Sequence, residues 1–355
     1  MYRTAFLGFS LLTVIGCGQQ PAQIDTAQCT GSSVYLGAPL RESLSFDVPS
    51  TRAFVDRPFD PQITTRLNAA LLRASTASGA SAIQAVVLQS DAGSWEGRVG
   101  VSSDGLSPLG SIAKLAIAQS ILKFQDQGDL SVNDTVSSYV ADVPAGDLIT
   151  LRMLLTHTSG IADRRNGAYA LQGCPGEEWR YSNEGYNLLG QVISSVTDKP
   201  FQAAVNETVL ADMGPDALRF VGPADTLAGI APPERSASGQ VFDVRDANAA
   251  GALVGTPAAA AEFLVSVLMD RGPRLDRLYP MDQQGLWYGQ GVMVYDVPGA
   301  CGTNVWIGHS GSVPGARAIV AYAPSFNAIV AVTLQGNGSV ESVANLLFEA
   351  LAAPN

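Results

Sequence analysis

A serine and a lysine stand three residues apart at the start of an apolar segment, at Ser111 and Lys114. The segment reads GSIAKLAIAQSILKFQ from 110 to 125 and has the periodicity of a helix, in which side chains at i and i+3 are neighbours. Because a helix turns by about 100° per residue, both side chains share a face with apolar residues and should point into the protein. Burial disfavours an ammonium ion, so the pKa of such a lysine falls. A neutral amine beside a hydroxyl can accept its proton, which would make Ser111 an activated nucleophile.

The same spacing occurs again in this segment, at Ser120 and Lys123, so the spacing alone is a weak signal. The second pair lies nine residues further on, which turns a helix by about half a revolution and places the pair on the opposite face. We therefore expect Ser120 and Lys123 to be a solvated surface pair. A simpler interpretation of the first pair also exists: Ser111 only caps the helix, and Lys114 extends its amine to water.

Two later segments carry polar groups that could join Ser111, namely RYSNEGY from 180 to 186 and GHSGSVPG from 308 to 315. Each has an ordinary structural explanation. Tyr181 could be a buried tyrosine bonded to a carbonyl, Asn183 could cap a helix, and His309 could be a hairpin residue. His157, the other histidine of the chain, is expected to be structural, as a cation at a helix end or through a backbone bond.

The S-x-x-K, Tyr-x-Asn and His-x-Gly motifs follow in an order that resembles the penicillin-recognising serine hydrolases, a superfamily of class C β-lactamases, D-Ala-D-Ala carboxypeptidases and related serine esterases. The stretches LLTHTSGI and WYGQGV are also similar to that superfamily, and the resemblance covers roughly residues 61–352. It implies that Ser111 is the acylated nucleophile. It also implies that Lys114 and Tyr181 move the proton from Ser111 to the leaving group.

The resemblance further implies a set of substrate-binding residues, which are Asn183, His309, Ser310, Gly311 and Ser312. Asn183 would bind the amide of the substrate. His309 stands where β-lactamases usually carry a lysine, and it would orient Tyr181 or the substrate.

The strand that carries these residues would complete an oxyanion hole. The backbone N–H groups of Ser111 and Ser312 would bind the charge that develops in the transition state. Gly311 would let the substrate lie against the strand, since a side chain there would block it. Some carboxypeptidases of this type bind the substrate carboxylate with an arginine at a position where this chain has Met293. Arg317 could take over that role.

These residues predict an exported serine hydrolase that works through an acyl-enzyme on Ser111 and acts like a D-Ala-D-Ala carboxypeptidase on cell-wall peptides. The His-x-Gly form favours this branch over typical β-lactamases. A carboxylic esterase or a class C-like β-lactamase is the alternative enzyme, and a non-catalytic peptidoglycan-binding or partner-binding module is the alternative of another class. The chain has no G-x-S-x-G motif, which disfavours a Ser-His-Asp enzyme of the α/β-hydrolase type.

Periodicity predicts the elements that must position these residues. A helix is expected over 61–76, strands over 81–90 and 94–103, and mostly helix over 111–272, with N-caps at Thr150 and Thr256 and a stop at Gly272. Strands follow at 286–297, 303–312, 316–324 and 328–336, and a helix closes the chain at 340–352. The predicted fold is α/β (α+β) and β-lactamase/DD-peptidase-like: an antiparallel sheet built from both chain ends with flanking terminal helices, plus a mostly helical inserted subdomain at about 111–280. The groove between the two parts is the expected place for the site.

Composition limits the partners of this protein. The 355 residues are 46% hydrophobic, which suffices for a large core, and the net charge of −11 disfavours binding to nucleic acid. No metal or organic cofactor is expected, because the two histidines and the cysteines lack metal-ligand spacing. The expected partner is a small-molecule or peptidoglycan peptide substrate, and the expected state is a monomer.

The N-terminus resembles a bacterial lipoprotein signal. One cation precedes a short apolar run that ends at Cys17, so residues 1–16 are predicted to be a signal peptide and Cys17 to carry lipid. Residues 17–60 would form the lipidated N-terminus and tether, ahead of a hydrolase domain at 61–352. The protein would then be lipid-anchored in the cell envelope, at the periplasm or outer membrane, or secreted if the lipid site is not used. Cys29, Cys174 and Cys301 allow three pairings, and the sequence does not choose among them.

Overall fold

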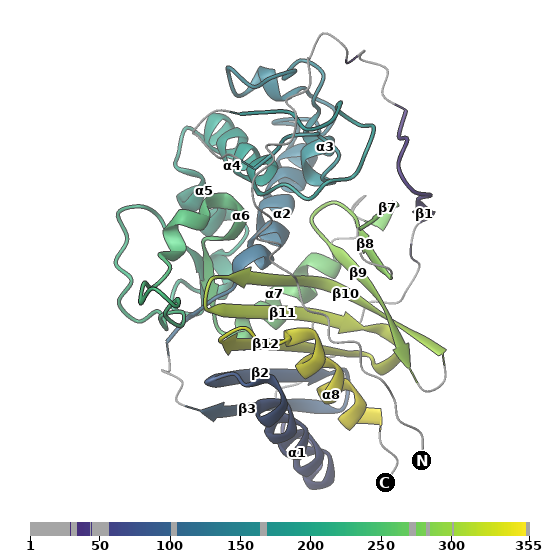
Figure 1. Cartoon of the computed structure of the whole chain (residues 1–355), viewed down its shortest axis with the longest axis vertical. Helices are drawn as coiled ribbons and strands as arrows, with labels where there is room; N and C mark the ends of the chain where they lie inside the picture. Colours follow the sequence, from purple (N-terminus) through teal and green to yellow (C-terminus); the bar gives the residue numbers. More distant parts are fainter. Residues whose placement is uncertain are drawn as a thin grey trace.

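The computed structural model describes residues 29, 34–42, 44, 57–100, 105–163, 169–269, 275–281, 285–299 and 302–352. Its main sheet has nine antiparallel strands in the order β1-β7-β8-β9-β10-β11-β12-β2-β3 (Figure 1). The strands are β1 (Arg41–Glu42), β2 (Ala82–Gln89), β3 (Gly93–Gly100), β7 (Arg277–Pro280), β8 (Leu286–Tyr288), β9 (Met293–Gly299), β10 (Gly302–Val313), β11 (Ala316–Ala323) and β12 (Ala328–Gln335). β2 pairs with β12, with Ala85 opposite Val332. The prediction of an antiparallel sheet built from both chain ends is confirmed.

Helices cover both faces of this sheet. α1 (Pro61–Ser78) and α8 (Val340–Ala352) pack together on one face, whereas α7 (Pro257–Met269) contacts β2, β11 and β12 on the other (Figure 1). Successive side chains of β12 point to opposite faces of the sheet, so they pack into two different cores. Val330 and Val332 join the core beneath α1 and α8, and Ile329 and Ala331 join the core that includes α7.

The inserted part is mostly helical and surrounds one central helix. Its elements are η3 (Gly110–Ile112), α2 (Ala113–Gln127), η4 (Val136–Ser138), α3 (Leu151–Leu155), α4 (Asn183–Thr197), α5 (Phe201–Thr208), η5 (Ala211–Met213), η6 (Val244–Ala247) and α6 (Asn248–Gly251). A small sheet in the order β4-β6-β5, which the sequence analysis missed, joins β4 (Ser107–Pro108), β6 (Leu253–Gly255) and β5 (Leu218–Phe220). Two elements within the subdomain expected at about 111–280 belong to the main sheet layer instead. The helix α7 packs on this sheet, and β7 is one of its strands.

The central helix α2 corrects the expectation for the second serine–lysine pair. Ser120 is fully buried, and its hydroxyl donates to the Ala116 carbonyl at 2.9 Å. Lys123 Nζ donates to the Thr208 carbonyl of α5 at 2.8 Å. The predicted solvated pair is wrong for Ser120, because neighbouring helices cover this face of α2 as well.

Helix starts follow their predicted caps. The Thr150 hydroxyl accepts from the Met153 backbone N–H, and the Thr256 hydroxyl accepts from that of Ala259, as expected for N-caps. The predicted stop at Gly272 lies outside the described residues.

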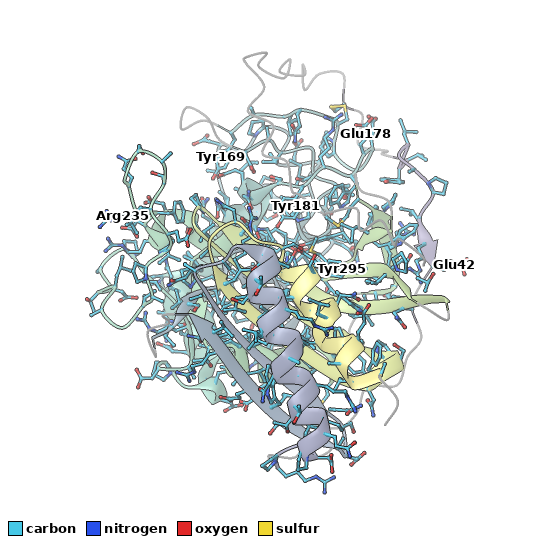
Figure 2. The ribbon with its side chains drawn as sticks, turned by 60° about the horizontal axis from the view of Figure 1, so that its bottom comes forward. Glu42, Tyr169, Glu178, Tyr181, Arg235 and Tyr295 are labelled. Atoms are coloured by element: carbon cyan, nitrogen blue, oxygen red, sulfur yellow. A yellow bond between two sulfur atoms is a disulfide. The ribbon has the colours of Figure 1, made fainter. Side chains whose placement is uncertain are left out.

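Part of the segment expected to be a tether is attached to the body. Cys29 forms a disulfide with Cys174, which resolves the pairing that the sequence left open (Figure 2). The Leu36 N–H donates to the Glu177 carbonyl at 2.7 Å, and β1 pairs with β7 at the sheet edge. The predicted signal peptide at 1–16, the lipid site at Cys17, and Cys301 lie outside the described residues. Among the helices of the described part of the chain, none has the length and apolar character needed to span a membrane.

Candidate active site

The amine of Lys114 lies in the interior of the protein, next to Ser111. Lys114 is 0% exposed, and its Nζ lies 3.0 Å from Ser111 Oγ. Ser111 is part of the single turn η3, which leads directly into α2, and no side chain caps either element. The simpler interpretation, in which the serine only caps a helix and the lysine reaches water, is therefore wrong.

Three oxygen atoms surround the Lys114 amine. Besides Ser111 Oγ, these are Asn183 Oδ1 and the Ala250 carbonyl oxygen, each at 2.9 Å. Burial lowers the pKa of Lys114 from 10.5 to about 7, and the charge of Asp163 opposes part of this shift. Amide and carbonyl oxygens only accept hydrogen bonds, so they take the two N–H groups of a neutral amine. Its lone pair is then left for the hydroxyl of Ser111.

Tyr181 lies next to this amine, near the middle of the molecule (Figure 2). The centre of its ring is 4.9 Å from Lys114 Nζ. Burial raises the pKa of Tyr181, whereas a hydrogen bond with Ser111 opposes the rise. Tyr181 is thus a neutral phenol near pH 7, next to both Ser111 and Lys114, and it can donate a proton.

Asn183 contacts Lys114 through its side chain rather than capping α4. The cap of α4 is Ser182, whose hydroxyl accepts from the Gly185 N–H at 2.9 Å. The Asn183 amide instead accepts from Lys114 and donates from Nδ2 to Asp163 Oδ2 at 3.1 Å. Asp163 is not among the predicted site residues, because no motif spacing connects it to Asn183, twenty positions later.

The His309 ring is buried and hydrogen-bonded to Tyr288 and Ser310. It is 1% exposed, its Nδ1 lies 2.6 Å from the Ser310 carbonyl oxygen, and its Nε2 lies 3.1 Å from Tyr288 Oη. Because a carbonyl only accepts, Nδ1 carries the proton and Nε2 accepts from Tyr288. Burial lowers the pKa of His309 to about 3, so the ring is neutral. Among the described residues, this ring is therefore hydrogen-bonded to Tyr288 and Ser310 and not to Tyr181, and its expected contact with the substrate stays a prediction.

The strand β10 approaches the turn that carries Ser111 very closely. A Cβ on Gly311 would lie 1.9 Å from the Leu109 carbonyl oxygen and 2.9 Å from the Ser111 nitrogen. A Cβ on Gly110 would lie 2.7 Å from the Ser312 nitrogen. Gly311 thus makes room for the chain's own backbone, and its expected role toward the substrate stays a prediction. The same approach brings together the backbone nitrogens of Ser111 and Ser312.

The side chains next to Gly311 belong to two different environments. The Ser310 hydroxyl lies 3.9 Å from Met293 Sδ, which also accepts from Tyr295 Oη at 3.2 Å. The Ser312 hydroxyl is exposed and accepts from Arg317 Nη1 at 2.8 Å. Arg317 therefore places a cation beside the strand end that carries Ser312.

His157 is buried behind Tyr181. Its Nδ1 accepts from the Ser182 N–H at 3.1 Å, and its ring centre is 4.2 Å from that of Tyr181. Burial holds its pKa well below 6.5, and the charges of Lys114 and His309 act in the same direction. Of the two structural roles expected for His157, the structure shows the backbone bond and excludes the cation.

Comparisons with known proteins identify relatives of this chain. A model of the Beta-lactamase family matches residues 71–353. The D-alanyl-D-alanine-carboxypeptidase/endopeptidase AmpH of Escherichia coli (strain K12) is 26% identical over 226 residues, which are 55% of this chain and 58% of AmpH. The penicillin-binding protein PbpX of Bacillus subtilis (strain 168) is 35% identical over 120 residues, which are 30% of each chain. The chain thus matches less than two thirds of the length of either relative.

Solved structures share the fold. The D-amino acid amidase from Ochrobactrum anthropi SV3, complexed with L-phenylalanine, has a TM-score of 0.70 at 20% identity, covering 82% of this chain and 98% of the amidase. The β-lactamase/D-alanine carboxypeptidase from Pseudomonas syringae has a TM-score of 0.67 at 17% identity, covering 82% and 99%. At these identities the likeness concerns the fold.

Proposed function

Because the chain belongs to the Beta-lactamase family and is a serine hydrolase of the β-lactamase and DD-peptidase type, we propose that it removes the terminal D-alanine from D-alanyl-D-alanine peptides. The single observation that carries the proposal is the buried Lys114 amine, 3.0 Å from the hydroxyl of Ser111. A protein that only binds peptidoglycan has no need of such a base.

The proposed reaction begins with acylation of Ser111. Its hydroxyl proton passes to the neutral Lys114 amine while Oγ attacks the substrate carbonyl carbon. The N–H groups of Ser111 and Ser312 stabilise the resulting oxyanion, and one such donor contributes about 3–4 kcal/mol in related chemistry. The phenol of Tyr181 gives its proton to the leaving amine and regains one from the Lys114 ammonium. A water molecule then hydrolyses the acyl-enzyme with these proton transfers reversed.

Recognition of the substrate carboxylate is proposed for Arg317. Arg317 is half-buried as a residue, and its Nη1 lies 2.8 Å from the hydroxyl of Ser312 at the surface. The neutral His309 cannot supply a positive charge, and the Lys114 amine faces Ser111. Met293 is uncharged, and this favours a carboxylic ester as the second candidate substrate. Weak class C-like β-lactamase activity remains part of the same proposal.

We further propose that the protein acts outside the cytoplasm, on small-molecule or peptidoglycan peptide substrates. The disulfide between Cys29 and Cys174 supports export, because disulfides persist in oxidising compartments. Within this proposal, residues 1–16 are the signal peptide, 61–352 the hydrolase domain, and the lipid on Cys17 the membrane attachment of a monomer.

Covalent labelling of the purified protein tests the hydrolase. A fluorescent penicillin and a fluorophosphonate should label wild type and fail to label Ser111→Ala. A wild type that neither reagent labels would instead favour the binding module. Initial rates on a D-Ala-D-Ala peptide, a p-nitrophenyl ester and a chromogenic cephalosporin then rank the substrate classes. Turnover of the ester alone would reject the carboxypeptidase, and Arg317→Gln should raise the KM for the peptide while leaving that for the ester unchanged.

A further inference from the structure

Asp163 makes three hydrogen bonds to the start of α4, although it belongs to none of the sequence motifs. Its Oδ1 accepts from the backbone N–H groups of Asn183 at 2.7 Å and Glu184 at 3.1 Å. Its Oδ2 accepts from Asn183 Nδ2 at 3.1 Å. The first two bonds satisfy free N–H groups of the helix, as a cap does. The third bond holds a side chain that contacts Lys114.

This third bond leaves the Asn183 amide one orientation. A carboxylate only accepts hydrogen bonds, so the NH₂ end of the amide must face Asp163. The oxygen end then faces Lys114 Nζ at 2.9 Å. If the amide were turned around, its NH₂ group would face the Lys114 amine. The lone pair of a neutral amine would then accept a hydrogen bond from this NH₂ group and would not be available to the hydroxyl of Ser111.

We propose that Asp163 is a positioning residue, which fixes the amide of Asn183 and thereby directs the lone pair of Lys114 to the hydroxyl of Ser111. The Ala250 carbonyl oxygen is the second obligate acceptor, so both N–H groups of the neutral amine are used. The proton of Ser111 is then transferred to the free lone pair as Oγ forms its bond to the substrate. This role rests on the acylation of Ser111 proposed above, and it adds Asp163 as the residue that orients the base.

Asp163 also affects the charge of the amine. Among the described residues around Lys114, Tyr181 and Tyr186 are phenols that lie within 4.9 Å and 5.4 Å of Nζ, measured to their ring centres. His157 and His309 are neutral because burial lowers the pKa of each. Asp163 is the charged group that raises the pKa of Lys114, so its neutralisation should lower that pKa below about 7.

The substitution Asp163→Asn separates positioning from capping. One oxygen accepts both backbone N–H groups, and asparagine retains that oxygen. The NH₂ group of the new side chain would face Asn183 Nδ2, so two donors would meet and Asn183 should turn around. We expect the rate at which a fluorophosphonate phosphonylates Ser111, with release of fluoride, to fall about a hundredfold, the loss that typically follows when a general base is misdirected. We also expect the acidic limb of its pH profile to move to lower pH.

A second substitution, at Asn183, should restore the hydrogen bond between the side chains at positions 163 and 183. In the double variant Asp163→Asn with Asn183→Asp, the NH₂ group at 163 meets a carboxylate, whose other oxygen again accepts from Lys114. We expect the double variant to recover at least tenfold in rate on its high-pH plateau, with an acidic limb at higher pH than in Asp163→Asn.

Asp60→Asn is the matched control, because Asp60 caps α1 through Oδ1 far from the site. This control should leave unchanged both the labelling rate and the acidic limb of its pH profile.

Either of two outcomes would overturn the inference. One is an Asp163→Asn variant with the rate and pH profile of wild type. The other is a variant that loses thermal stability and rate with an unmoved acidic limb and no recovery in the double variant, which is the behaviour of a cap alone. If Asp163→Asn does not fold, Asp163→Ser keeps a backbone acceptor and should still move the limb to lower pH. Wild-type labelling that depends on Ser111 shows separately that the proposed hydrolase stands.

Discussion

At the scale of single residues, the chemistry depends on one amine that is neutral near physiological pH. Full burial of Lys114 lowers its pKa to about 7, and three oxygen atoms hold its nitrogen in place. The two histidines of the chain do not titrate near pH 7, because burial lowers the pKa of each ring well below 6.5. Lys114 is therefore the group expected to titrate in the rate of acylation.

The pH profile of acylation tests this assignment. The neutral amine is the active form, so the rate should rise with pH through about 7 and then level off. Lys114→Arg, which stays protonated, should lower the rate at least a hundredfold. As a control, proton NMR of the two histidine rings should show no titration between about pH 5 and 8. A histidine that titrates together with the rate would refute the assignment to Lys114.

At the scale of elements, the site exists because a turn and a strand touch through two glycines. Gly110 has a φ of +54° and lies against Ser312, and Gly311 lies against Leu109. The two backbones can approach because neither residue has a Cβ. This approach places the nucleophile of η3 beside the candidate oxyanion donor of β10.

Gly311→Ala should separate these two elements. The new Cβ would lie 1.9 Å from the Leu109 carbonyl oxygen, so η3 and β10 must move apart. We expect fluorophosphonate labelling to slow about a hundredfold, since a displacement of about 1 Å has such effects on catalysis. Gly222→Ala is the matched control, because its Cβ would meet no atom closer than 3.5 Å. Wild-type labelling rates in Gly311→Ala would contradict the role given to this contact.

At the scale of the whole molecule, the segment made of Cys29 and residues 34–42 contacts both the helical part and the edge of the sheet. Cys29 and Leu36 attach it next to the loop that leads to Tyr181, through Cys174 and Glu177. Further along, Arg41 pairs with Asp296 of β9 at 2.8 Å. The segment therefore contacts both parts of the fold, and its Tyr35 and Leu40 pack against the core beneath α1 and α8.

Removing the disulfide should destabilise the molecule and leave the chemistry of Lys114 unchanged. The bond closes a loop between residues 145 positions apart, and loss of a native disulfide typically costs about 2–5 kcal/mol. We expect the variant with Cys29→Ser and Cys174→Ser to unfold at lower denaturant concentration, with the acidic limb of acylation unmoved. Reduction of the wild type with a thiol should have the same effect. Equal stability of both forms would show that the segment contributes little to the fold.

The sequence by itself determined the local features of this protein. Helical periodicity placed Ser111 and Lys114 on one buried face, and the strand patterns identified the strands of the main sheet except β1 and β7, with β8 and β9 predicted as one strand. Threonine caps gave the starts of α3 and α7. These predictions succeeded because each depends on residues a few positions apart, whose geometry a helix or strand fixes.

Only the tertiary structure decided which distant groups meet the amine. Asn183 and Ala250 lie 69 and 136 positions from Lys114, and Asp163 reaches it through Asn183. Burial of Ser120 and the pairing of Cys29 with Cys174 were decided in the same way. Local periodicity gives the direction of a side chain from its own helix or strand. The group it meets depends on how separate elements pack, and that is set by the whole core.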